Sequence, residues 1–479
     1  MDDPLRGLLD LSRRTAEPLA RQLTGQLRSL IADGRLRPGQ RLPSSRALAR
    51  SLGISRNTAS QAIEQLVAEG YLVASQSRRP VVAEGASLAT ATRGGKEASA
   101  QPSRFRLSRW AQQLSRTHWP PAYDGRPRAF QPGLPDEREF PHEFWGRCLR
   151  HAARSSLHVD RSHNCPELQE ALLGHLADLR GIKAQPGQVI IVPSAQAGIA
   201  LITRVLIEAG DVVWIESPGY GGAFAALQAA GAEVIGVPLD AEGLTLAGRR
   251  KTPRMIFATP SHQYPTGRLM PVDRRLALLQ FARKSAAAIV EDDYDGEFHY
   301  DGRPVAALAS LDPNARVVYL GTFSKATIAN VRVGYVIVPE GLAPTFALAQ
   351  RHLGLAVAVT LQKALAEFIG AGAYLSHVRR MTRLYRARRD RLVQALAAEV
   401  GDALTVESPA GGMQLLARCA PSIDDVALSH RLQRAGVTAR PLSEMLYHRS
   451  RERGLFLGFA AWNEAEIDAG TRVLGRCLR

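Results

Sequence analysis

The feature that most constrains the fold is a series of apolar runs that recurs from about residue 120 onward. The runs read QVIIV, DVVWIES, AEVIGVPL, MIFATP, AAAIVEDD and RVVYLGTFS, and helical or turn-rich stretches separate them. Near-continuous apolar strands of this length are typical of a mainly parallel sheet covered on both faces. We therefore expect an α/β domain over residues 120–479, with a smaller C-terminal lobe after about Gly341, where the pattern becomes helical and then mixed.

The first 84 residues follow a different pattern, of three short helices and a hairpin. Pro18–Asp33 carries apolar residues at helical spacing, SRALARSL stops at Gly53, and Ser55 can cap the helix that follows. The runs YLV and VV suggest two small strands around a polar turn. This order predicts a winged helix-turn-helix over residues 12–84.

Residues 85–119 lack periodicity and are small, polar and basic, as in GASLATATRGGKEASAQPSR. Such a composition buries too little apolar surface to offset the entropy of ordering. We expect a linker here.

The formal charge of +16 favours a polyanionic partner. Only six of the 61 Lys and Arg residues are lysines, a bias that either arginine-rich codon usage or DNA contact would produce. The four cysteines lie far apart, which argues against a disulfide scaffold and fits a reducing compartment. With no apolar leader and no membrane-length apolar run, we expect a cytoplasmic protein without a membrane partner.

The turn SLGIS and the helix after it have the chemistry of a DNA-reading element. A recognition helix needs short polar or forked basic side chains near its N-terminus, and Ser55, Arg56, Asn57 and Thr58 supply them. Arg46, on the preceding helix, could brace the DNA backbone. The alternative is a helical trio used only for dimerisation, which would not require the SRNT cluster.

The segment LPSSRALARSLGISRNTASQAIEQLVAEGYL resembles the N-terminal DNA-binding domain of the GntR family. The resemblance implies that Arg46, Ser55, Arg56 and Thr58 contact double-stranded operator DNA. The wing tip of the family is usually rich in glycine, whereas this chain has SRRP there. We expect Arg78 in this wing to bind DNA by charge.

The segment VVYLGTFSKATIANVRVGY carries the most chemistry in the second domain. Lys325 follows a strand and a small hydroxyl-bearing turn, a setting suited to a desolvated lysine that condenses with an aldehyde cofactor. Thr322, Ser324 and Arg332 suit a phosphate group beside that amine.

A cluster of carboxylates, EDDYD, follows the strand AAAIV. Pyridoxal phosphate needs an acid paired with its pyridine nitrogen, and a phenol near its ring oxygen can tune the imine. Asp292 and Tyr294 fit these two tasks. The alternative is an acidic metal site, but no histidine cluster accompanies it, so we expect no metal.

Two further loops follow predicted strands. Ser194, Ala195 and Gln196 precede a helix, where phosphate is commonly held. Tyr220 could stack on a cofactor ring or be a structural tyrosine.

The motifs GD-VVWIESPGY, TPSHQYPTG, EDDYDGEFHY and GTFSK together resemble the fold-type I aminotransferase domain of MocR/GabR regulators. The resemblance implies that Lys325 is the internal aldimine lysine, Asp292 the pyridinium partner and Tyr294 the ligand of the ring oxygen. It also implies a phosphate site formed by Ser194, Gln196, Thr322, Ser324 and Arg332. Either His262 or Gln263 is expected near the ring.

Some positions depart from the resemblance. Relatives that sense γ-aminobutyrate have an arginine where this chain has Gly222, and the arginine common slightly later is Phe224. Arg440 could bind a substrate carboxylate or be a surface residue. The chain therefore retains the cofactor site better than the substrate clamp.

These observations predict a homodimeric transcriptional regulator that binds DNA and senses pyridoxal phosphate, alone or as its aldimine with an amino compound. The alternative is a true aminotransferase with an accessory DNA-binding domain. A residual half-reaction is compatible with either. A cofactor-free scaffold is a third interpretation, against which the intact EDDYD and GTFSK motifs argue.

Overall fold

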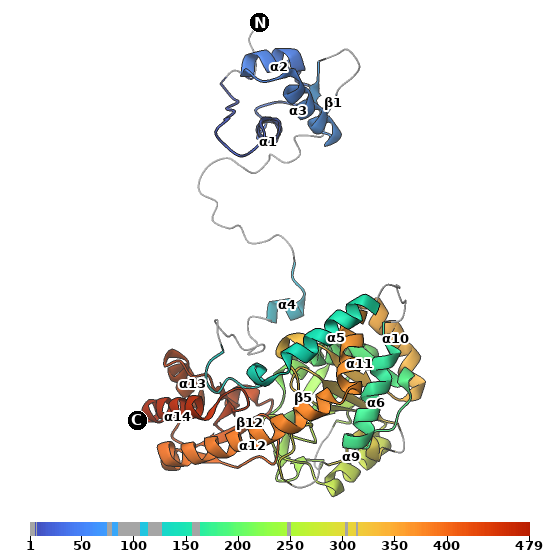
Figure 1. Ribbon diagram of the computed structural model, residues 1–479, viewed down its shortest axis with the longest axis vertical. Helices are drawn as coiled ribbons and strands as arrows, with labels where there is room; N and C mark the ends of the chain where they lie inside the picture. Colours follow the sequence, from blue (N-terminus) through green and yellow to red (C-terminus); the bar gives the residue numbers. More distant parts are fainter. Residues whose placement is uncertain are drawn as a thin grey trace. The chain divides into compact units, whose positions relative to one another are not determined.

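The computed structural model of this chain describes residues 5, 7–73, 79–84, 106–113, 127–155, 163–246, 251–301, 305–312 and 315–479. The chain forms two compact units, Met1–Arg106 and Leu107–Arg479, which are described separately (Figure 1). The predicted linker, residues 85–119, falls largely outside the described ranges. Within it, the structure describes one short helix, α4 (Arg109–Gln113).

The small unit contains the predicted three helices and two strands. These are α1 (Leu19–Ala32), α2 (Ser45–Leu52), α3 (Arg56–Ala68), β1 (Leu72–Val73) and β2 (Val81–Val82), and the two strands pair antiparallel. Ser44 and Ser55 cap α2 and α3 by accepting backbone N–H bonds of 3.3 and 3.0 Å. Gly53 ends α2 with a positive φ of 62°, a conformation that glycine adopts without steric strain.

One apolar core holds the small unit together. Leu23 and Leu27 of α1 pack with Leu48 of α2 and Leu66 of α3. Leu5 belongs to the same core, so the packed unit includes residues before position 12.

An eight-stranded sheet forms the centre of the large unit. Its order is β3-β10-β9-β8-β7-β4-β5-β6, with bounds β3 (Val189–Val192), β10 (Gly334–Ile337), β9 (Val317–Thr322), β8 (Ala288–Asp293), β7 (Met255–Ala258), β4 (Val212–Ser217), β5 (Glu233–Asp240) and β6 (Gly243–Leu244). The neighbouring strands from β9 to β5 run parallel to one another. Strand β10 pairs antiparallel with both β3 and β9, and β6 pairs antiparallel with β5. The predicted mainly parallel α/β sheet is confirmed.

Helices cover both faces of this sheet, which explains the near-continuous apolar strands. In β3, Val189 and Ile191 pack on one side, and Ile190 and Val192 pack on the other. The first face is covered by α5 (His142–Ser155), α6 (Pro166–Arg180), α9 (Val272–Ser285), α11 (Val359–Gly370) and α12 (Ala373–Val400). The second face is covered by α7 (Ala195–Leu206), α8 (Gly221–Ala229) and α10 (Ala343–His352).

The end of the chain forms the smaller lobe that the sequence predicts. A four-stranded antiparallel sheet has the order β11 (Leu404–Val406), β12 (Gln414–Cys419), β14 (Gly454–Gly458) and β13 (Arg440–Pro441). Two helices, α13 (Asp425–Arg434) and α14 (Glu464–Leu478), complete the lobe, and α14 packs along α12 (Figure 1).

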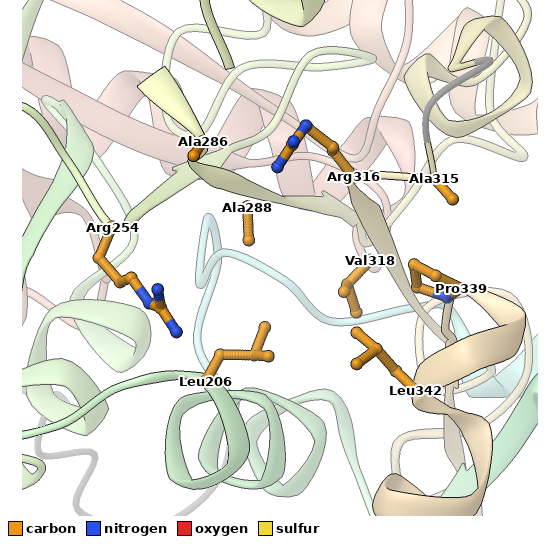
Figure 2. Close-up of a pocket in the computed structure, with 9 residues that line it drawn as sticks. All are labelled: Leu206, Arg254, Ala286, Ala288, Ala315, Arg316, Val318, Pro339 and Leu342. Carbon is orange, nitrogen blue, oxygen red and sulfur yellow. The ribbon is translucent and has the colours of Figure 1, made fainter. Parts of the chain in front are cut away.

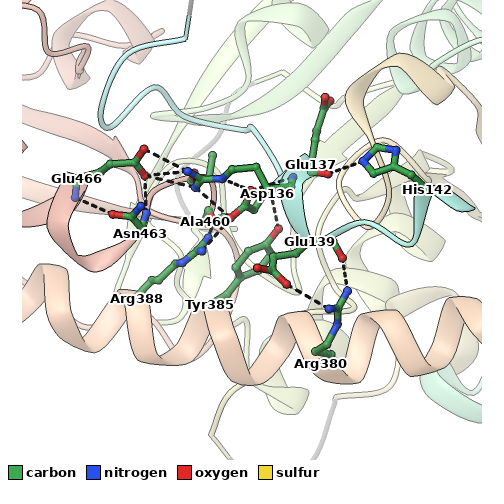
Figure 3. Close-up of polar contacts among 12 residues, drawn as sticks. Asp136, Glu137, Glu139, His142, Arg380, Tyr385, Arg388, Ala460, Asn463 and Glu466 are labelled. Carbon is green, nitrogen blue, oxygen red and sulfur yellow. Dashed lines mark hydrogen bonds and ion pairs between the residues drawn. The ribbon is translucent and has the colours of Figure 1, made fainter.

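A buried ion pair fastens the segment before α5 to this lobe (Figure 3). Arg388 of α12 donates to Asp136 over 2.8 Å, and both side chains are nearly fully buried. The hydroxyl of Tyr385, also on α12, accepts a hydrogen bond of 2.9 Å from the backbone N–H of Asp136. Arg138 adds a second ion pair to Asp136 and reaches Glu466 on α14. Residues 131–136 are thereby held against the lobe.

Candidate functional site

A cavity of about 460 Å³ opens at the carboxyl ends of β8 and β9, beside the N-terminus of α7. Parallel sheets place their ligands at this edge. The walls include most of the predicted cofactor-site residues: Ser194, Ala195, Gln196, Tyr220, Asp292, Tyr294, Thr322, Ser324, Lys325, Arg332 and Arg440. Residues that are far apart in the sequence therefore meet in one place.

Lys325 follows β9 and places its amine in this cavity. Burial lowers the pKa of Lys325, while the charges of Asp295 and Asp292 oppose that shift. Its Nζ donates to the Gly133 carbonyl over 2.6 Å. A lysine with a lowered pKa is more readily deprotonated, which nucleophilic attack on an aldehyde requires.

Asp292 lies near the end of β8 and is 4% exposed. Burial, together with the nearby carboxylates Asp293, Asp295 and Glu216, raises its pKa to about 8. Its Oδ1 is buried and has no hydrogen-bond partner among the described residues. A protonated pyridine nitrogen would satisfy this orphaned acceptor and restore the ionised carboxylate.

Two of the other three carboxylates of EDDYD, Glu291 and Asp293, do not face the cavity. Because side chains alternate along a strand, Glu291 and Asp293 point to the opposite face from Asp292. Glu291 accepts the backbone N–H groups of Leu308 and Ala309, and Asp293 pairs with Arg180 at 2.7 Å. This divergence argues against a shared metal site.

One end of the cavity offers groups suited to a phosphate. The hydroxyl of Ser194 caps α7, whose N-terminal dipole favours an anion. Thr322 and Ser324 line the same end. Arg332 is exposed, adopts a positive φ of 46°, and its guanidinium has no partner among the described residues. The donor set fits pyridoxal phosphate at both its ring nitrogen and its phosphate.

Aromatic rings form another wall. Tyr264 makes edge-on contacts with Tyr220, Tyr294 and Phe456, at centroid distances of 5.4, 5.8 and 5.0 Å. Tyr220 also donates to Gln196 over 3.3 Å, and burial raises its pKa. A flat apolar ring would be matched by this wall.

Arg440, on β13, also lines the cavity and is 6% exposed, so it is not a surface residue. It donates to the hydroxyl of Tyr264 over 3.0 Å. Its cross-strand neighbour is Phe456 on β14. The cavity therefore holds a second cation besides Arg332, in an aromatic setting.

His262 and Gln263, the pair between which the sequence could not decide, do not line the cavity. His262 bonds to Asp295 at 2.9 Å, and the Gln263 amide donates to Glu216 and to the Pro218 carbonyl. The next residue, Tyr264, faces the cavity instead. His262 contacts the cavity only indirectly: it hydrogen bonds to Asp295, whose charge raises the pKa of Lys325.

The wall formed by residues 131–134 was not anticipated. Gly133 approaches Lys325 so closely that a Cβ on it would lie 2.9 Å from the amine. Gln414, on β12, accepts the Gly133 N–H over 3.0 Å and also hydrogen bonds to Tyr294. The run FQPGLPD, dense in turn residues, was the signal that could have identified this wall.

Gly222, where the family resemblance implies an arginine in some members, is closely packed. A Cβ there would lie 2.2 Å from the Gln196 side-chain oxygen and 2.6 Å from the Tyr220 ring. Phe224, slightly later, stacks on Tyr447 with centroids 4.2 Å apart. Packing thus occupies both positions at which the resemblance implies arginine in those members.

In the small unit, the predicted DNA-contacting residues occupy one exposed region. Arg46 on α2 and Arg56 on α3 are exposed and have no partner among the described residues. Ser55 and Thr58 bond to one another at 2.8 Å, so their hydroxyls also shape the start of α3. Arg78 lies outside the described residues.

Comparisons with known proteins agree with both units. The family described as aminotransferase class I and II matches residues 142–473, and the bacterial regulatory proteins of the gntR family match residues 19–82. No helix among the described residues has the length and apolar character to span a bilayer.

Similar full-length proteins combine these two parts. A probable rhizopine catabolism regulatory protein, MocR, from Rhizobium meliloti is 38% identical over 98% of this chain and 95% of its own length. The pyridoxine biosynthesis transcriptional regulator PdxR of Corynebacterium glutamicum is 32% identical, over 92% of each chain. The structure of a Pyrococcus horikoshii kynurenine aminotransferase is 26% identical, with a TM-score of 0.68, over 78% of this chain and 95% of that one.

Proposed function

The chain belongs to the MocR family of transcriptional regulators, which join a GntR-type helix-turn-helix to an aminotransferase-like domain, and from this premise we propose how its two units act. The large unit binds pyridoxal phosphate in the cavity at Lys325. The small unit binds operator DNA through α3 and the preceding helix α2. Arg56 on α3 and Arg46 on α2 are the proposed contacts. The unpartnered Oδ1 of Asp292, in the same cavity as Lys325, is the observation that carries the cofactor assignment.

When bound, pyridoxal phosphate supplies an aldehyde that a lysine amine can attack and a ring that withdraws electrons. Asp292 holds the proton on the ring nitrogen. Ser194, Thr322, Ser324 and Arg332 hold the phosphate, and Tyr220, Tyr264 and Tyr294 orient the ring between them. Lys325, whose amine donates to the Gly133 carbonyl, would supply the amine for that aldehyde.

The ligand acts as a signal only if it binds two conformations of the protein unequally. We propose that pyridoxal phosphate itself is sensed, since this chain has Gly222 and Phe224, both packed against neighbouring side chains, where the family resemblance implies arginines in amine-sensing members. Arg440, which also lines the cavity, could pair with the anionic group of an amino compound that binds as a second ligand. A homodimer would present two DNA-binding units to two half-sites in the cytoplasm.

The test is binding of the full-length protein to DNA from upstream of its own gene, with and without pyridoxal phosphate. Specific binding that changes with the cofactor is the expected result. Specific binding that ignores the cofactor would contradict cofactor sensing. Sustained turnover of an amino donor with a keto acid would favour the enzyme alternative.

The DNA contact is tested by Arg56→Ala. If Arg56 reads bases, the loss of sequence preference should cost about 1–3 kcal/mol. Equal losses on operator and random DNA would instead make Arg56 a phosphate contact. Arg21→Ala, on α1, is a matched control because Arg21 is exposed and lies outside α2 and α3.

A further inference from the structure

A second cavity, of about 190 Å³, lies at the opposite edge of the large sheet (Figure 2). Ala288 begins β8 and Val318 is the second residue of β9, whereas Asp292 and Thr322 lie four residues further along the same strands. Four residues of strand span about 13 Å. The second cavity is therefore separate from the cofactor site.

Two arginines give this cavity its charge. Arg254 precedes β7 and Arg316 precedes β9, and no carboxylate is among the lining residues that the structure describes. Figure 2 shows Arg254 extending between Leu206 and Ala288, with Arg316 turned toward Ala286. In the described ranges, neither guanidinium has an ion pair, and the Nε of Arg316 is buried without a hydrogen bond.

The nearest carboxylate in the sequence is already engaged. Asp312 accepts the backbone N–H groups of Arg316 and Val317, the second over 2.9 Å. It therefore fixes the start of β9 and forms no ion pair with the Arg316 side chain. A buried guanidinium nitrogen without an acceptor is unfavourable, so the Nε of the half-buried Arg316 would be stabilised by an acceptor, whereas Arg254 is exposed to solvent.

The remaining wall is apolar. Leu206, Val318, Pro339 and Leu342 supply its apolar side chains, and Figure 2 shows Leu206 beside Arg254. The volume is equivalent to several water molecules, given about 30 Å³ for each in the liquid. Arginine forks match the planar, two-oxygen geometry of a carboxylate.

Two alanines at the rim hold an uncommon backbone conformation. Ala286 and Ala315 have φ values of 55° and 49°, in the left-handed region that residues other than glycine seldom adopt. Both line the cavity. Ala286 is the left-handed residue that ends α9, whereas Ala315 precedes Arg316 and β9.

We propose that this cavity binds a small organic carboxylate with a short apolar body, held by Arg254 and Arg316. The site lies at the amino ends of β8 and β9, distinct from the cofactor cavity, and does not depend on the function proposed above.

The test uses the full-length protein saturated with pyridoxal phosphate, with benzoate as the probe in a calorimetric or NMR titration. Benzoate is expected to bind, whereas benzamide and inorganic phosphate bind at least tenfold more weakly, because each lacks either the charge or the apolar body. Arg316→Gln combined with Arg254→Gln should weaken benzoate binding by tenfold or more.

Controls separate this site from the others. Arg283→Gln replaces an exposed arginine of α9 outside the cavity and should leave benzoate affinity unchanged. Ala288→Leu fills the cavity without altering its charge and should abolish binding. Loss of benzoate binding in Arg440→Gln, with binding retained in the Arg254/Arg316 double variant, would locate the probe in the cofactor cavity and overturn the proposal. An absence of benzoate binding would also overturn it.

Discussion

The two units bring their functional residues together in opposite ways. In the small unit, Arg46, Ser55, Arg56 and Thr58 lie within 13 residues of sequence, on an exposed surface built by two adjacent helices. In the large unit, the cavity draws residues from Gln131 to Phe456 and places them inside. A surface that reads DNA needs only local structure, whereas a buried cofactor site needs the whole fold.

The comparison implies that changes in the large unit alter cofactor binding and the stability of that unit, whereas changes in the small unit alter DNA binding and the stability of the small unit. Four predictions test this separation, each on one unit.

The largest expected effect follows from Lys325→Ala. Lys325 is the single lysine among the described residues of the cavity wall, so its removal should abolish the visible absorption of bound pyridoxal phosphate and its trapping by borohydride. DNA binding without the cofactor should persist. Lys284→Ala, an exposed lysine on α9, is the control. An unchanged absorption spectrum in Lys325→Ala would refute the assignment of this amine.

Asp136→Ala should destabilise the large unit by about 3–5 kcal/mol, because it leaves the Arg388 guanidinium buried without its carboxylate. Denaturant unfolding should show this loss in the transition of the large unit only. Asp178→Ala removes an exposed carboxylate of α6 and should change little. A shift in the small unit's transition would show that the two units do not unfold independently.

The third prediction concerns pH. Burial raises the pKa of Asp292 to about 8 and those of Glu216, Glu291 and Glu297 to about 7, whereas an unfolded carboxyl titrates near 4. Between these values the native state holds more protons than the unfolded state. Its free energy of unfolding therefore falls as pH rises.

For the cofactor-free protein, we expect Asp292 alone to contribute a loss of about 2 kcal/mol between pH 6 and 8.5. Asp292→Asn should flatten this dependence in denaturant titrations at the two pH values. In the small unit, hydrogen bonds from Gln65 and Arg28 lower the pKa of Glu69, so that unit should not share the decline. A parallel decline in both units would contradict the comparison.

The smallest effect is expected from Ser55→Ala. The Ser55 hydroxyl accepts the Thr58 N–H, and losing this cap should destabilise the small unit by about 1 kcal/mol. Thermal unfolding measures the change, and Ser55→Asp, which can still cap, should restore stability. Equal destabilisation by both substitutions would mean that the hydroxyl has another role.

The sequence predicts the small unit closely because its signals are local. Ser44, Gly53 and Ser55 mark helix ends by interactions within four residues, and the structure has these helix ends where the sequence places them. The large sheet is equally predictable, since strands buried on both faces are apolar throughout. Residues at or just beyond the carboxyl ends of strands, such as Asp292 and Lys325, could be assigned to the cavity for the same reason.

The rest of the cavity depends on contacts that are distant in sequence. Whether His262, Gln263 or Tyr264 faces the cavity is decided by Asp295, in the loop after β8, and Glu216, on β4, which bind the first two. Gln414 and Phe456 come from the C-terminal lobe, and residues 131–134 are held there by the Asp136–Arg388 pair. No local sequence pattern predicts that these distant segments come together at the cavity.

The packing around Gly222 also has an evolutionary consequence. An arginine introduced here would bring even its first carbon against the side chains of Gln196 and Tyr220, so both would have to move. Tyr220 lines the cofactor cavity. A change of ligand preference through this position would thus also reshape the wall of the cofactor cavity, so that the two properties could not evolve independently.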